Sequence, residues 1–102
     1  SGKSVQVLIT ESEGAVLEFK SSLRWDYREN KLGKHIEMAV VKTIAAFLNS
    51  EGGTLIIGVD DEGNILGLEK DYTTLKIKNR DGFEQALTQL ISNKIENISV
   101  IF

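Results

Sequence analysis

Four acidic residues and one lysine are the residues of this chain best suited to phosphodiester chemistry. Glu18 and Lys20 stand two residues apart, Glu13 lies upstream, and the pair Asp60 and Asp61 follows an apolar run. Carboxylates at a strand edge bind Mg²⁺ or Mn²⁺, and a nearby lysine stabilises the charge that develops on a phosphate. The pattern is compatible with metal-assisted phosphodiester cleavage. A surface ion pair beside ordinary turn residues explains the same spacing and is the more frequent case.

A second group of residues mixes cations with aromatic rings. Cations neutralise phosphates and flat rings stack on exposed bases, so the group suits a contact surface for single strands or for a nucleic-acid backbone. A tryptophan in such a stretch is equally often a core residue with solvated neighbours. The group comprises Arg24, Trp25, Tyr27, Arg28, Lys31 and Lys34.

Cations also alternate with other residues at Lys76, Lys78 and Arg80. If this segment is extended, its cations project on one side. The stripe is then either a ridge that follows phosphates or an edge strand protected by charge against aggregation, and the edge strand is favoured for the stripe taken alone. His35 is expected on a helix surface without a role.

Composition narrows the classes of site and partner. The 102 residues carry a net charge of -3 and contain no cysteine and a single histidine, which excludes disulfides, thiolate nucleophiles and zinc sites rich in Cys or His. Any metal must therefore be held by oxygen. A uniformly basic nucleic-acid coat is excluded, although residues 1–50 sum to +1 and residues 51–102 to -4. Without a long apolar run we expect a soluble protein, and the lack of a secretory signal pattern and of cysteine predicts a cytoplasmic one.

Hydrophobic periodicity predicts the elements that position these residues. Residues 16–20 alternate as a half-buried strand with a charged outer face, and residues 22–33 form a loop. Residues 34–49 have helical spacing and should end at the Asn and Gly residues that follow. A hairpin follows, with strands at 54–59 and 64–68. A second helix is expected at 81–94, opened by a capping box of Asp81 and Glu84, and a C-terminal strand in need of a partner at 98–102.

The order of these signals resembles that of a known family. The segments are LEFKSS at 17–22, TIAAFLN at 43–49 and EGGTLIIGVDDEGNILGL at 51–68. Together they resemble the Schlafen-like, AlbA-type DNA-binding domain, and the resemblance covers nearly the whole chain from Glu11. It implies an α+β fold in which a small mixed sheet is backed by two main helices. It also implies a domain over 11–102 that lacks its C-terminal strands, with 1–10 as a tail or tag remnant.

The resemblance also implies partners and roles. Such domains usually form the N-terminal module of bacterial and archaeal regulators, whereas similar animal domains are metal-dependent endoribonucleases with three acidic residues. Those acids match Glu13, Glu18 and Asp61, or Asp60 one step earlier, with Lys20 beside them. The leading hypothesis is a nucleic-acid-binding module for DNA or RNA that uses its basic loop. The alternatives are an endoribonuclease that uses Mg²⁺ or Mn²⁺ and a homodimerisation module, in each case with further domains in the full-length protein.

Overall fold

The computed structural model describes residues 17–91 and 98–102. Glu13 and the predicted tail at 1–10 lie outside these residues. Along the chain the elements are β1 (Leu17–Lys20), β2 (Trp25–Asp26), β3 (Lys31–Leu32), α2 (Lys34–Leu48), β4 (Gly53–Ile57), α3 (Glu69–Tyr72), α4 (Arg80–Ile91) and β5 (Ile98–Ile101).

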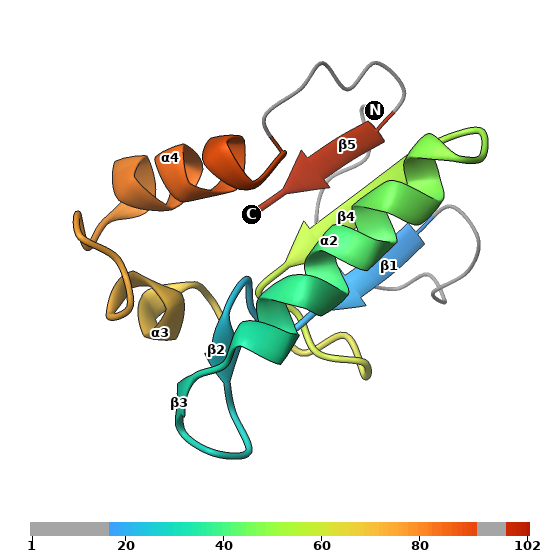
Figure 1. Ribbon diagram of the computed structural model, residues 1–102. Helices are drawn as coiled ribbons and strands as arrows, with labels where there is room; N and C mark the ends of the chain where they lie inside the picture. Colours follow the sequence, from blue (N-terminus) through green and yellow to red (C-terminus); the bar gives the residue numbers. More distant parts are fainter. Residues whose placement is uncertain (1–16, 92–97) are drawn as a thin grey trace.

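Two small sheets carry the fold. The larger has the order β1-β4-β5 with parallel pairing throughout, and β2 and β3 form a separate antiparallel hairpin. The predicted α+β class is confirmed, although the parallel and antiparallel pairings expected in one mixed sheet belong to two. The C-terminal strand finds its partner in β4, and Figure 1 shows it on the opposite side of β4 from β1. Pairing of two copies through a sheet edge stays a prediction.

The alternation in β1 sorts its side chains between the two faces of the sheet. Leu17 and Phe19 are buried and pack with Ile56 of β4 on one face. Glu18 and Lys20 are half-buried and pair in register with Leu55 and Ile57, whose side chains belong to the other cluster. The charged face of β1 therefore lies on the α2 side of the sheet, at its edge, instead of facing away from the fold.

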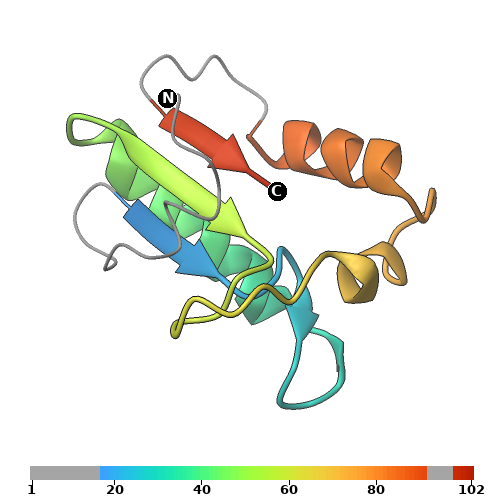
Figure 2. The same ribbon diagram turned by 180° about the vertical axis from the view of Figure 1, so that it is seen from behind.

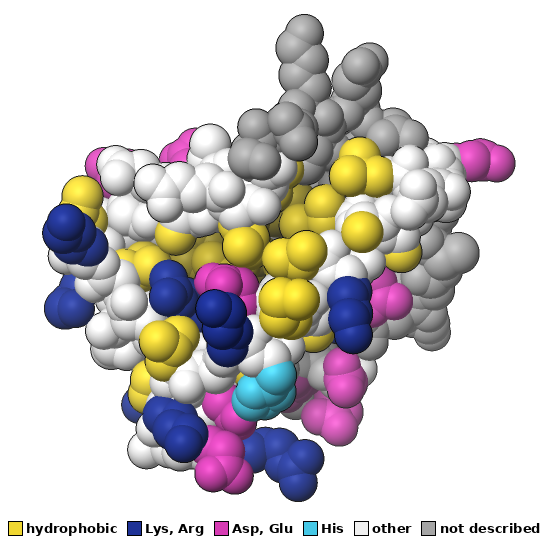
Figure 3. Space-filling view, in the orientation of Figure 1, with side chains coloured by type: hydrophobic (Ala, Val, Ile, Leu, Met, Phe, Trp, Pro, Cys, Tyr) yellow, Lys and Arg dark blue, Asp and Glu magenta, His cyan; other side chains and the backbone are white. Residues whose placement is uncertain are grey.

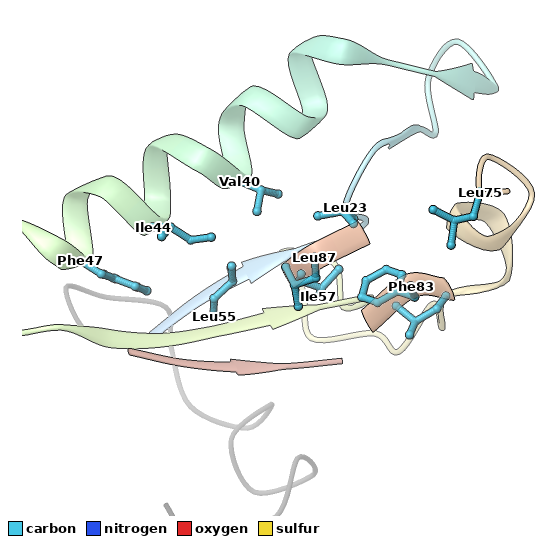
Figure 4. Packing of buried hydrophobic residues seen from close by; sticks show 10 residues of the cluster. Leu23, Val40, Ile44, Phe47, Leu55, Ile57, Leu75, Phe83 and Leu87 are labelled. Carbon is cyan, nitrogen blue, oxygen red and sulfur yellow. The ribbon is translucent and has the colours of Figure 1, made fainter. Parts of the chain in front are cut away.

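Helix α2 covers one face of the sheet, as the view from behind in Figure 2 makes clear. Its predicted extent is confirmed except that Asn49 is the C-cap instead of the last helical residue. Val40, Ile44 and Phe47 recur at spacings of four and three and are its buried residues. Figure 4 shows these three side chains directed toward β4, where they join the main hydrophobic core.

The segment between α3 and α4 is bent and contains no strand, so the extended backbone on which both interpretations of the Lys76 to Arg80 stripe depend is not present there. The Lys78 ammonium donates to the carbonyl oxygens of Leu75 (2.8 Å) and of Thr73 (3.3 Å), the C-cap of α3, so it satisfies acceptors in the turn that follows the helix. The predicted capping box is also wrong, because the Asn79 side chain accepts the hydrogen bond from the Gly82 N–H at 2.9 Å. The residues with alternating charge therefore belong to a turn and to the start of a helix, not to a strand.

The predicted hairpin after β4 is reduced to a turn. Only Val59 and Ile65 form an antiparallel bridge, and no described strand contains residues 58–68. Gly58 has a φ of 95°, and a Cβ there would lie 2.9 Å from the Gly67 carbonyl oxygen. The close backbone approach expected from these glycines is confirmed.

Within the described part of the chain, no helix combines the length and apolar character needed to cross a membrane.

Candidate nucleic-acid interface

A cleft of about 380 Å³ lies where β1 ends, the β2–β3 hairpin begins and α2 starts. Strand ends, a hairpin and the first turns of a helix each contribute to its walls, so residues far apart in sequence meet there. Its polar and aromatic lining comprises Lys20, Ser21, Ser22, Trp25, Asp26, Tyr27, Arg28, His35 and Asp61. Phe19, Ile36 and Ala39 complete it.

Parallel pairing brings Lys20 and Asp61 to the same cleft. The carboxyl ends of parallel strands meet at one edge of a sheet, and the chain after β4 contacts the end of β1. The Gly58 N–H donates to the Lys20 carbonyl oxygen at 2.7 Å, and the Val59 N–H does so at 3.3 Å. The cleft therefore joins the LEFK strand to the turn that follows β4.

The two adjacent aspartates in this turn have different surroundings. The Asp60 carboxylate accepts hydrogen bonds from the backbone N–H groups of Glu62 (3.0 Å) and Asn64 (2.8 Å) and from the Asn64 side-chain amide (3.0 Å). The Asn64 side chain, followed by these N–H groups, lowers the pKa of Asp60. Asp60 thus holds the turn together, whereas Asp61 is exposed and lines the cleft.

Asp26 organises the hairpin that was predicted to be a loop. Its buried carboxylate accepts hydrogen bonds from the N–H groups of Arg28 (2.9 Å) and Glu29 (3.0 Å), and the His35 Nε2 lies 3.0 Å from its other oxygen. The Glu29 N–H, the largest influence, lowers the pKa of Asp26, and its effect outweighs that of burial. The hairpin turn is thereby tied to the first turn of α2.

Asp71 fixes the segment at 23–25, which leads into the hairpin. Its carboxylate is 1% exposed and accepts three backbone hydrogen bonds, from Leu23 (2.7 Å), Arg24 (2.9 Å) and Trp25 (3.0 Å). Burial raises the pKa of Asp71, and the three donors act in the opposite direction. Sequence reasoning missed Asp71 because its partners lie 46 to 48 residues away and leave no local pattern.

The aromatic and cationic residues of the hairpin are not equally available. The Trp25 ring is half-buried, and the Lys70 ammonium lies 5.6 Å from its centroid. Arg24 is also half-buried, with its Nε 3.9 Å from the Glu37 carboxylate. The Tyr27 side chain is exposed, and partial burial raises its pKa, with acidic residues of α3 adding to the effect. Tyr27 is therefore the more accessible of the two rings.

Three cations of the predicted contact surface are exposed on or next to the hairpin: Arg28, Lys31 and Lys34. None has an ion-pair partner among the described residues. In the lower part of Figure 3, basic side chains surround the single histidine, with acidic side chains between them. Only Arg28 of these three lines the cleft.

Other predicted site residues lie elsewhere. Lys76 and Lys78 are in the connection from α3 to α4, and the Arg80 guanidinium lies 4.6 Å from the centroid of the Phe102 ring. Glu18 is half-buried one residue before the cleft begins. The structure thus brings together Lys20, Trp25, Arg28 and Asp61, and it leaves the Lys76 to Arg80 stripe outside this cleft.

The fit of a metal ion depends on the acidic residues. Among residues 17–91 and 98–102, no three His, Cys, Asp or Glu side chains are grouped closely enough to hold one. Of the predicted ligands, Asp61 lines the cleft and Glu18 does not, while Glu13 falls outside the described part. The described residues alone therefore do not make a metal centre.

Comparison with known proteins adds the family. The family described as Schlafen, AlbA_2 matches residues 13–101, and it associates the chain with nucleic-acid binding. No solved structure matches the chain. Because the match spans far more than half of the sequence, the chain belongs to the Schlafen AlbA_2 family.

Proposed function

We propose that this domain binds nucleic acid, with phosphate contacts from the cleft and from the exposed cations of the hairpin. The observation that carries the proposal is the cleft itself, because Lys20 and Arg28 share it with the rings of Trp25 and Tyr27. Cations paired with aromatic rings are the usual combination for a strand whose bases are accessible.

The overall charge does not oppose this function. The net charge of -3 is a sum over unlike regions, and acidic residues are more numerous than basic ones in the second half of the sequence. Arg28, Lys31 and Lys34 are exposed on or next to the hairpin. Local potential, more than net charge, governs the encounter with a phosphate backbone.

The proposal predicts a steep dependence of binding on salt. Fluorescence anisotropy with labelled DNA and RNA oligonucleotides should show the dissociation constant rising strongly between about 50 and 200 mM salt, because affinity that depends on phosphate contacts falls steeply over this range. Arg28→Ala and Lys20→Ala should each weaken binding about fivefold and reduce the salt slope by about one. Lys42→Ala, at an exposed position farther along α2, is the matched control and should leave both quantities unchanged. Affinity independent of salt contradicts the proposal.

Metal-dependent RNA cleavage is a second candidate that we propose for the same cleft. It is favoured by the presence of Lys20 and Asp61 in one lining, since an ammonium beside a carboxylate is part of the arrangement used for phosphodiester cleavage. Asp61 is the better third carboxylate, because Asp60 is occupied by three hydrogen bonds within its turn. The other two carboxylates of the proposed set are those of Glu18, one residue before the cleft lining begins, and Glu13.

This second candidate has its own test. Cleavage of a structured, tRNA-like RNA should require Mn²⁺ or Mg²⁺, and Glu18→Gln and Asp61→Asn should each reduce the rate at least a hundredfold, as expected for groups that act on the transition state (about 3 kcal/mol). Asp81→Asn, an exposed position on α4, is the control. Equal cleavage by Glu18→Gln and the parent chain rules out this role.

A further inference from the structure

We propose that the cleft receives one unstacked nucleotide, so that the domain prefers single-stranded nucleic acid to a continuous duplex. The inference rests on the proposed nucleic-acid binding and names the class of partner that fits this site. Three observations carry it: the size of the cleft, the types of side chain in its walls and the way its hairpin wall is fixed.

The size of the cleft suits a small group. Its volume of about 380 Å³ lies near the lower end of the range of roughly 300 to 1,000 Å³ that small-ligand sites occupy. A base within a duplex is stacked and paired, and it must leave the stack before it can enter a pocket of this kind. A continuous duplex can therefore place only phosphates and sugars against the mouth of the cleft.

The lining matches both parts of a nucleotide. Lys20 and Arg28 supply cations for a phosphate, and Tyr27, 41% exposed, offers a ring on which a base can stack. Asp61 adds a carboxylate, which repels phosphate but accepts hydrogen bonds from the N–H groups of a base edge. A site for phosphates alone does not need either the ring or the carboxylate.

The hairpin wall is held in place before any ligand arrives. Asp71 accepts the Trp25 N–H at 3.0 Å, and the Ser22 hydroxyl donates to the Trp25 carbonyl oxygen at 2.5 Å. Farther along, Asp26 accepts the Arg28 N–H at 2.9 Å and contacts His35 of α2. His35 is exposed and belongs to the part of the cleft lining that α2 contributes. A fixed wall lowers the ordering cost of binding.

The chain contains its own reporter, because Trp25 is the single tryptophan and lines the cleft. Its fluorescence should be quenched on titration with a single-stranded oligothymidine. A strand of equal length and phosphate number but with abasic sites, and an unbroken duplex, should bind at least about fivefold more weakly, with little quenching. Stacking of one base is worth about 1 to 3 kcal/mol, or about 5- to 150-fold in affinity.

Variants separate this inference from general phosphate binding. Tyr27→Ala should remove most of the discrimination between the oligothymidine and the abasic strand, whereas Tyr27→Phe should keep it. Lys31→Ala, in the same hairpin but outside the cleft lining, should weaken the binding of the oligothymidine and of the abasic strand by the same factor. Equal affinity for the oligothymidine, the abasic strand and the duplex, with a normal salt slope, overturns the inference and leaves nucleic-acid binding intact. Failure of all three ligands to bind overturns both.

Discussion

Replacement of Asp71 by alanine is expected to lower the free energy of unfolding by about 3 kcal/mol. The change leaves the N–H groups of Leu23, Arg24 and Trp25 without their acceptor at a position that is 1% exposed. Each buried, unsatisfied donor costs about 1 to 3 kcal/mol, and entry of water offsets part of that sum. Urea denaturation followed by circular dichroism measures the change. Glu84→Ala, on the exposed side of α4, is the control and should stay within about 0.5 kcal/mol of the parent.

The same position gives a pH signature. Because burial raises the pKa of Asp71, the folded state holds the proton more tightly than the unfolded chain does. The stability this proton confers is fully present below the unfolded value of 3.8 and is lost as pH rises through the raised pKa. Asp71→Asn cannot titrate and retains one acceptor oxygen, so the parent's stability relative to this variant should fall over that window. If the difference in free energy of unfolding between the parent and Asp71→Asn stays constant from roughly pH 3 to pH 7, the pKa of Asp71 is not raised in the folded state.

Gly82→Ala is expected to destabilise the domain by about 3 kcal/mol, against the normal preference of helices for alanine. Alanine in place of glycine inside a helix ordinarily adds about 1 kcal/mol. Here a Cβ would overlap the Ile77 carbonyl oxygen, which belongs to the backbone and cannot rotate away, at a position buried in α4. Relief requires displacement of the α3–α4 connection or of the helix.

Thermal unfolding of Gly82→Ala beside Gln85→Ala tests this steric argument. Gln85 is exposed on the same helix, so its replacement should raise stability slightly or leave it unchanged. The two alanine variants are therefore expected to move the melting temperature in different directions or by very different amounts. A Gly82→Ala protein that melts at or above the parent temperature shows that the close contact is not present in solution.

Local patterns predicted the elements that depend on hydrophobic burial. The spacing of Val40, Ile44 and Phe47 located α2, and the alternation of Leu17 and Phe19 located β1, because one face of each element must be removed from water. Charge patterns were poorer guides. The alternation of Lys76, Lys78 and Arg80 is compatible with an extended segment, but charged side chains on an exposed turn are under no such constraint.

The candidate site was predicted only in part for the same reason. The residue pattern and the family resemblance together predicted that Glu18 with Lys20 would converge with the turn after Val59. Lys20 and Asp61 of that turn line the cleft, whereas Glu18 does not. The role of Asp26 had a local signal, because an aspartate that accepts hydrogen bonds from the N–H groups two and three residues later is typical of a turn. His35 and Asp71 had none, because their partners are set by how distant segments pack. The types of side chain in the site could be read from the sequence, whereas the distant residues that hold them in position could not.

The bonds of Asp71 also bear on the order in which the chain can fold. Every element from β1 to β4 precedes residue 71, yet the segment at 23–25 that enters the hairpin has no acceptor for its three N–H groups until α3 has docked. Closing a loop of 46 to 48 residues carries an entropic cost that local helix formation does not. On the ribosome, therefore, α2 and the first strands can form before the N–H groups of residues 23–25 have their acceptor. The segment that leads into the hairpin wall of the cleft is fixed late, only after α3 has emerged.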